Sequence, residues 1–100
     1  MSDAEYRNTR FSVTVETRDA AVLHVLRALS QYCYGGKYKQ IAWGGTGEKQ
    51  WLADNHEVTF RFQSDSERRR FVAECQRLLD SSLWRVIATD DNNEATKQRG

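Results

Sequence analysis

Apolar and polar positions alternate strictly over residues 11–16, FSVTVE, which is typical of a strand with one buried face. Thr17 or Asp19 then supplies a cap, and apolar residues recur behind it at helical spacing. Gly35 and Gly36 are expected to end this helix, because glycine adopts the left-handed conformation of a helix C-terminus at little cost. The first third of the chain therefore predicts a strand followed by a helix.

The segment behind these glycines is expected to form further strands. KYKQIAW, residues 37–43, reads as one strand, and the glycine-rich GGTG that follows turns the chain. Residues 48–53, EKQWLA, are expected to add a short extra strand before a tight turn at Asp54 and Asn55. HEVTFRF, residues 56–62, alternates clearly between apolar and polar side chains and predicts the next strand.

The last part of the chain repeats the order of helix and strand. Ser64 and Glu67 form the S-x-x-E pattern of a capping box, so a helix is expected to begin there. An apolar stripe at helical spacing runs through residues 71–79, and the polar residues 80–82 end it. LWRVIAT, residues 83–89, predicts a final strand.

This order of elements predicts the fold class α+β. The simplest arrangement is a ferredoxin-like β-α-β-β-α-β sandwich, an antiparallel sheet with two helices on one face and an extra short strand between the second and third strands. We expect a single domain over residues 10–89, a flexible arm at residues 1–9, and a disordered tail at residues 90–100, which lack apolar periodicity.

Composition narrows the classes of function. The 100 residues carry a net charge of +1, so the whole molecule has no strong attraction to phosphate or to an anionic membrane. No apolar run approaches the ~20 residues of a membrane span, and the N-terminus lacks the apolar stretch of a signal peptide. The spacing of Cys33 and Cys75 matches no metal site. We expect a cytoplasmic protein without a metal or cofactor and with two buried thiols; a disulfide between the helices is the alternative.

A run of three arginines, Arg68 to Arg70, follows the predicted cap in SDSERRRF. Successive helical side chains are about 100° apart, so these arginines are expected to fan out rather than form one flat patch. Cations at a helix N-terminus oppose the helix dipole, which is not what helix stability alone favours. The run is either a solvated face with ion pairs or a surface that binds nucleic acid or an acidic protein.

Residues 32–51 interleave aromatic side chains with lysines. Such a segment can pack into the core, form a protein interface through its tyrosines and tryptophans, or stack bases while lysines meet phosphates. The predicted partner-binding residues are Tyr38, Lys39, Trp43, Lys49, Trp51, Arg68, Arg69 and Arg70.

Catalytic and nucleotide-binding patterns are weak. GGTGEK lacks the spacing of a phosphate-binding loop, and Gln50 stands where a serine or threonine would bind magnesium. Residues 55–62 match the pattern of an RNA-recognition motif only at the final aromatic, so that likeness stops at topology. His24 is expected on the helix surface and His56 at a turn, and no Cys/His pair is identifiable. The alternative for His56 is an acid–base pair with Glu57 or Asp54 in a cleft that binds a small molecule.

These observations favour a small non-catalytic module that acts by protein–protein interaction, of the inhibitor or adaptor type, as a monomer or as a homodimer through an edge strand. RNA or single-stranded DNA binding through the lysine-aromatic segment and the arginine run is the alternative.

Overall fold

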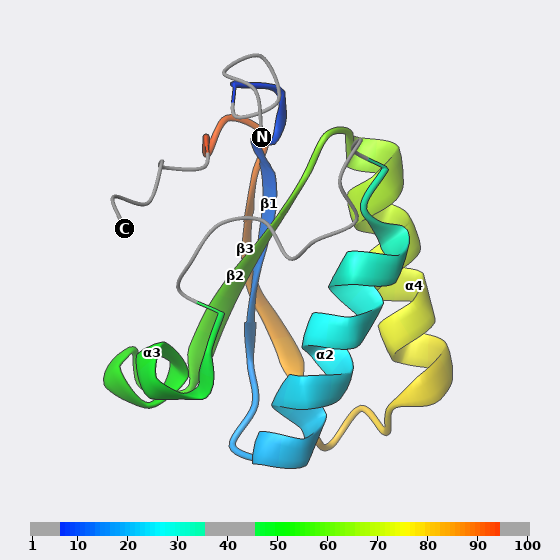
Figure 1. Ribbon diagram of the computed structural model, residues 1–100. Coiled ribbons are helices and arrows are strands. Elements are labelled where there is room, and N and C mark those ends of the chain that lie inside the picture. The colour runs from blue at the N-terminus through cyan, green and yellow to red at the C-terminus, as the bar shows by residue number, and fades with distance from the viewer. Residues whose placement is uncertain (1–6, 36–45, 95–100) are drawn as a thin grey trace.

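The computed structural model describes residues 7–35 and 46–94. Within these ranges the chain forms three strands: β1 (Phe11–Glu16), β2 (Glu57–Phe62) and β3 (Arg85–Asp90). It also forms three helices: α2 (Ala20–Cys33), α3 (Glu48–Ala53) and α4 (Asp65–Leu78). The described residues thus confirm the α+β class (Figure 1).

β1 is the central strand of an antiparallel sheet with the order β2-β1-β3. On one face Val13 lies opposite Phe60, and both side chains are buried. On the other face Thr14 lies opposite Thr59, and their hydroxyl oxygens are 2.8 Å apart. The alternation in the sequence therefore corresponds to an apolar face and a polar face of the sheet.

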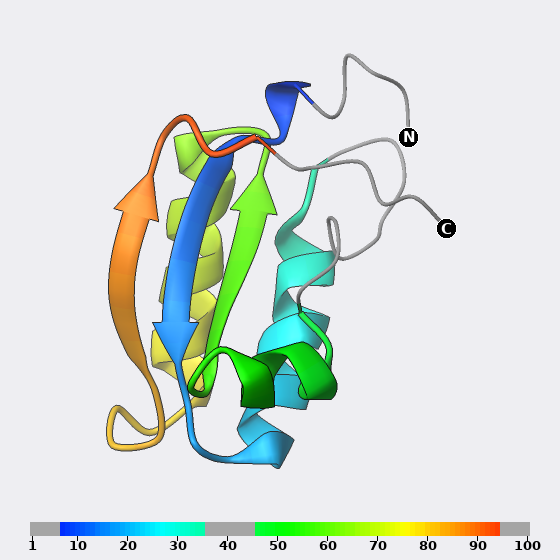
Figure 2. The ribbon, with the colours of Figure 1, turned by 90° about the vertical axis from the view of Figure 1, so that its left-hand side faces the viewer.

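α2 and α4 lie side by side against the apolar face of the sheet, where α4 contacts both β1 and β2 (Figures 1 and 2). The carboxylate of Asp19 caps α2 by accepting the N–H of Ala21 at 2.8 Å. The hydroxyl of Ser64 caps α4 by accepting the N–H of Glu67 at 3.1 Å, which confirms the predicted helix start. Both helices begin where short polar side chains satisfy backbone donors.

The end of α2 differs from the prediction in its cause. Tyr34 occupies the C-cap position with an extended backbone, φ −70°, and Gly35 does not adopt the left-handed conformation. The other predicted glycine, Gly36, lies outside the described residues. The N–H of Gly35 donates instead to the carboxylate of Glu67 at 2.9 Å. A Cβ at Gly35 would lie 2.7 Å from that carboxylate, so a larger residue here would displace the Glu67 side chain from its hydrogen bond.

Residues 48–53 form the helix α3, and the prediction of a short extra strand is wrong. The carbonyl of Gly47 accepts the N–H of Trp51 at 2.9 Å, and the amide of Gln50 donates to Asp54 at 3.0 Å, four residues on. The negative charge of Glu48 in the first turn interacts favourably with the helix dipole and so stabilises α3. The turn that follows agrees with the prediction for Asp54 and Asn55.

Several predicted features lie outside the described residues: the strand at 37–43, most of the arm at 1–9, and the end of the tail.

Asp90 to Asn93, which the sequence predicts to belong to the tail, contact the domain. The N–H of Asn93 donates to the carbonyl of Arg10 at 2.8 Å, and Arg61 donates to the side chain of Asn93 at 3.1 Å. In the described part of the chain, no helix is long and apolar enough to cross a membrane.

Candidate interaction surface

Arg68, the first arginine of the run, lies inside the domain. Its side chain is 9% exposed and forms ion pairs with Asp65 and Asp91. Its guanidinium also donates to the backbone carbonyls of Ser12 and Asp90, each at 3.1 Å. Burial alone would lower the pKa of Arg68, but the hydrogen bonds and charges of the two carboxylates outweigh burial and raise it. Arg68 joins α4 to the sheet and has little surface left for a partner.

The other two arginines lie on the surface and point in different directions. Arg69 pairs with Asp65 on its own helix at 3.0 Å. The guanidinium carbon of Arg70 lies 4.9 Å from the centroid of the Tyr32 ring on α2, within the range of a cation–π contact. The run therefore fans out as the helical spacing predicts and does not form one basic patch.

A second row of apolar side chains follows α2 on the side away from the core. Val22 and Leu26 point into the core, whereas Val25 is 38% exposed and Tyr32 is 62% exposed. Tyr32 lies next to α4, because the guanidinium of Arg70 on α4 stacks over its ring. We call this surface the outer helix face and define it by Ala21, Val25, Ala28 and Tyr32 of α2 and by Arg70, Ala73 and Arg77 of α4.

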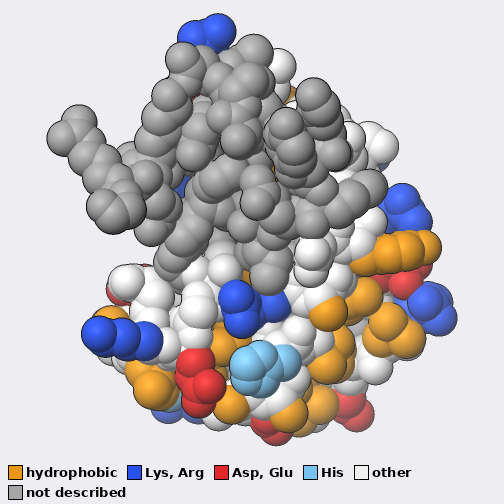
Figure 3. Space-filling model, viewed as in Figure 1, with side chains coloured by type: hydrophobic (Ala, Val, Ile, Leu, Met, Phe, Trp, Pro, Cys, Tyr) orange, Lys and Arg blue, Asp and Glu red, His pale blue; other side chains and the backbone are white. Residues whose placement is uncertain are grey.

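The outer helix face combines apolar area with positive charge. Figure 3 shows hydrophobic side chains gathered over α2 and α4, with Lys and Arg side chains beside them. Arg77 pairs with Glu74 at 2.7 Å, and that hydrogen bond raises the pKa of Arg77. Among the described residues, no carboxylate pairs with Arg70. The guanidinium of Arg70 is therefore available to a carboxylate from outside the chain.

The remaining predicted site residues do not gather at one place. Trp51 is 3% exposed, and its indole N–H donates to the carbonyl of Thr17 at 2.8 Å. Lys49 lies on the exposed side of α3. The predicted residues Tyr38, Lys39 and Trp43 lie outside the described residues. Of the two tryptophans in the aromatic segment, Trp51 belongs to the core and so offers almost no surface to a partner.

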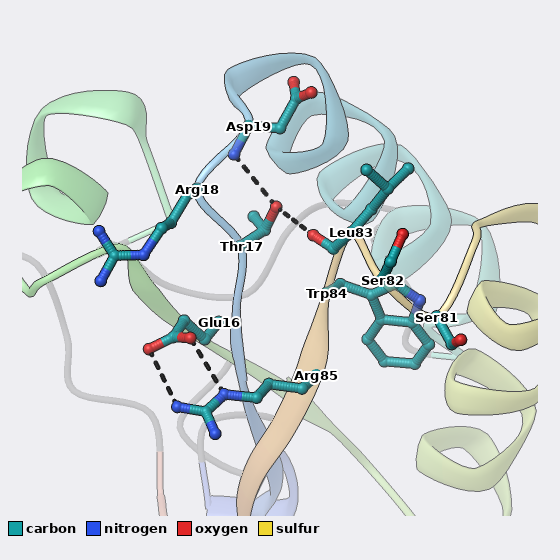
Figure 4. Close-up of a pocket in the computed structure, with 9 residues that line it drawn as sticks. All are labelled: Glu16, Thr17, Arg18, Asp19, Ser81, Ser82, Leu83, Trp84 and Arg85. Atoms are coloured by element: carbon teal, nitrogen blue, oxygen red, sulfur yellow. Dashed lines mark hydrogen bonds and ion pairs between the residues drawn. The ribbon is translucent and has the colours of Figure 1, made fainter.

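A cleft of about 350 Å³ opens where β1 leads into α2 and where the chain enters β3 (Figure 4). Glu16 and Arg85 form an ion pair at 3.0 Å in its wall, and the hydrogen bond from Arg85 lowers the pKa of Glu16. The hydroxyl of Thr17 donates to the carbonyl of Leu83 at 2.8 Å. The residues that line the cleft include two serines but no histidine or cysteine.

The histidines lie where the sequence analysis expected them. His24 is exposed on α2, with its Nε2 atom 3.9 Å from the carboxylate of Glu48. His56 lies in the turn after α3 with φ 66°, and its ring packs edge-on against Trp51 at 4.8 Å between centroids. Within residues 7–35 and 46–94, no group of three His, Cys, Asp or Glu side chains is arranged to hold a metal ion.

The two cysteines are buried on facing helices, Cys33 on α2 and Cys75 on α4. Burial, with smaller contributions from Cys33 and Glu74, raises the pKa of the Cys75 thiol to about 12. The thiolate is the reactive form of cysteine, so Cys75 is expected to be inert in the folded protein.

The raised pKa of Cys75 predicts a loss of stability at alkaline pH. An unfolded chain releases this proton near the ordinary pKa of 9.0, whereas the folded chain keeps it until about 12. The free energy of unfolding should therefore fall as the pH rises between these values, because the unfolded state binds fewer protons there. Urea unfolding from pH ~8 to pH ~10.5 measures this slope. A Cys75→Ala variant should show a shallower slope; equal slopes would contradict the assignment.

Comparisons with protein-family models, with curated proteins and with solved structures find no match to this chain.

Sequence reasoning missed the outer helix face, although its signal is present in the sequence. Residues 21, 25, 28 and 32 recur at helical spacing, as do the core residues of the same helix. The first helix therefore has two apolar rows, and only one of them can face the sheet. The second row marks apolar surface that remains exposed.

Proposed function

We propose that this chain is a small non-catalytic binding module that acts by protein–protein interaction through the outer helix face. The observation that carries the proposal is Tyr32, which is 62% exposed within an apolar row and lies under the guanidinium of Arg70. Tyrosine and arginine are the residue types that supply much of the binding energy of protein interfaces. Their contact also holds both side chains in place before a partner arrives.

The chemistry of this surface selects a kind of partner. Val25 and the alanines beside it provide a shallow apolar strip on which the apolar side chains of a partner can pack. Arg70 lacks a carboxylate partner among the described residues, so a carboxylate beside those apolar side chains would complete its hydrogen bonding. We propose an amphipathic protein segment with at least one acidic residue as the occupant.

The finer fold assignment, a ferredoxin-like sandwich, remains a proposal. It is supported by the strand order β2-β1-β3, since the first strand of such a fold lies between the third and the fourth and runs antiparallel to both. The predicted strand at residues 37–43 would pair with the other edge of β2 as the second strand. In this arrangement, as in the described residues, α2 and α4 share one face of the sheet.

Nucleic-acid binding is the weaker proposal for the same chain. Arg68 is buried and Arg69 pairs with Asp65, so only Arg70 of the run carries an unpaired charge in the described part of the chain. The polar face of the sheet presents Thr14 and Thr59 at its centre instead of aromatic rings. Stacking of bases would then depend on the predicted residues outside the described ranges.

Site-specific photo-crosslinking tests the protein-interaction proposal. A photoreactive phenylalanine analogue is placed at Val25 or at Tyr32 on the outer helix face, and at Lys49 on the exposed side of α3 as a control. We expect the same protein adduct from positions 25 and 32 in cells of the native host, and none from position 49. An adduct from position 49 alone, or adducts that disappear with nuclease, would contradict the proposal.

Substitution then measures the contribution of the two central side chains. The paired change Tyr32→Ala and Arg70→Ala should weaken binding of the crosslinked partner by at least about tenfold. Both residues are exposed, so the midpoint of urea unfolding should remain close to that of the native chain. Unchanged affinity in this folded variant would exclude the outer helix face as the binding surface.

A further inference from the structure

β3 is an edge strand with an unusual degree of exposure. All six of its residues, RVIATD, are exposed, including Val86 at 42% and Ile87 at 39%. Figure 2 shows β3 at the outer margin of the sheet, and among the described residues no strand pairs with its outer edge. The strand therefore presents unpaired backbone donors and acceptors together with apolar side chains.

A bulge in β3 determines which of its side chains share a face. Pairing with β1 moves from Ala88 opposite Thr14 to Val86 opposite Val15, so Ile87 is an extra residue without its own partner. Arg85 at the start of β3 lies opposite Glu16, and Asp90 at its end lies opposite Ser12.

Because Ser12 and Glu16 are four residues apart on β1, they lie on the same face of the sheet. Their partners Asp90 and Arg85 lie on that face as well. Without the bulge, these two residues, five positions apart, would point to opposite faces.

We propose that β3 pairs antiparallel with β3 of a second copy of this chain, about a two-fold axis at Ala88. In this register Arg85 of each copy lies opposite Asp90 of the other, and Val86 with Ile87 lies opposite Thr89. The two-fold axis repeats each contact, so the dimer contains this pair of opposite charges twice, once at each end of the paired strands. The bulge makes this register possible, because Val86 and Ile87 together occupy one position in the strand pairing.

The side chains at the ends of β3 have donor and acceptor atoms left for these contacts. One carboxylate oxygen of Asp90 accepts the N–H of Asn92 at 2.8 Å, which leaves the other oxygen for a guanidinium. Arg85 pairs with Glu16 at 3.0 Å and is 68% exposed, so it can bridge Glu16 and the incoming carboxylate. Arg85 is thus placed between two acidic groups in the dimer.

The usual protections of an edge strand are weak here. Natural edge strands are blocked by lysine, proline or a bulge that turns the strand away. β3 contains no lysine or proline, and its bulge aligns the charges for self-pairing. The paired segment is only six residues long, so we expect a weak dimer with a dissociation constant in the micromolar range. The dimer would form one continuous six-stranded sheet from the described strands and would leave both outer helix faces open.

Sedimentation velocity over a series of protein concentrations tests the proposal. The native chain should shift from monomer to dimer as its concentration rises. Asp90→Arg places two arginines opposite each other at both ends of the interface, and Arg85→Asp places two aspartates there, so each variant alone should remain monomeric. An equimolar mixture of the two variants restores both opposite-charge pairs and should dimerise again. Lys49→Glu, a charge reversal on α3, should dimerise like the native chain.

Three outcomes would overturn the proposal. One is a native chain that stays monomeric up to several hundred micromolar. Another is a dimer that persists in both single variants with unchanged affinity, because a different surface would then hold it. The third is a mixture that fails to dimerise although circular dichroism shows that both variants are folded. The proposal is independent of partner binding at the outer helix face, because the two surfaces share no residue.

Discussion

Replacing Arg68 with alanine is expected to lower the free energy of unfolding by about 2–4 kcal/mol. The substitution leaves the carbonyl of Ser12 without its donor in a buried position and removes the contacts that hold Asp65 and Asp91. The two carboxylates are partly exposed, so water replaces part of the stabilisation that they lose. The expected loss of stability is therefore smaller than for breaking a fully buried ion pair. Urea unfolding followed by circular dichroism measures the change.

The neighbouring arginines provide matched controls for this prediction. Arg69→Ala and Arg70→Ala remove the same charge from the same helix, but both side chains are exposed. Each is expected to change the free energy of unfolding by less than about 0.5 kcal/mol. If all three variants lost the same stability, the structural role assigned to Arg68 would be incorrect.

Replacing Trp51 with alanine is expected to lower the free energy of unfolding by about 3–5 kcal/mol, the largest effect predicted for this chain. The indole fills the space between α3 and the rest of the core, and its N–H satisfies the carbonyl of Thr17. Domains of this size have only about 5–15 kcal/mol of stability in total, so the variant is expected to be partly unfolded at moderate urea concentrations. The shift of the urea midpoint is the measurement.

Two further variants separate the contributions of the Trp51 side chain. Trp51→Phe keeps an aromatic ring in the core but removes the indole donor, and should cost about 1–2 kcal/mol. Lys49→Ala changes an exposed residue on the same short helix and should cost less than about 0.5 kcal/mol. A Trp51→Ala protein with native stability would show that this side chain is not part of the core. Loss of partner binding in that variant would not locate a contact, because the fold itself is affected.

The elements with long, regular patterns were predictable from the sequence. β1 and β2 follow from strict alternation, and α4 follows from the cap at Ser64 and the stripe behind it. α3 was not predictable in the same way, since six residues are too few to separate a helical period from a strand period. The inward direction of Trp51 is fixed by the hydrogen bond of its indole with Thr17, far away in the sequence.

The site was harder to predict than the fold because residue type alone does not reveal burial. Arg68 stands three residues before Phe71 and seven before Cys75, so it heads the buried row of α4. That spacing indicates the inward direction, but part of what stabilises an arginine there is its ion pair with Asp91, more than 20 residues later. Pairings of this kind are set by topology and are invisible in a local pattern.

The position of β1 has a consequence for how the chain is made. Among the described strands, β1 is synthesised before both of its partners, β2, which begins at residue 57, and β3, which begins at residue 85. β1 therefore has no partner strand until β2 and β3 have been synthesised, and contacts between such distant segments form slowly. The ion pair of Arg68 also cannot form until Asp91 has been synthesised. We expect the described domain to fold only after residue 91 has been synthesised, so nascent chains that end before that point should bind chaperones that cover apolar segments.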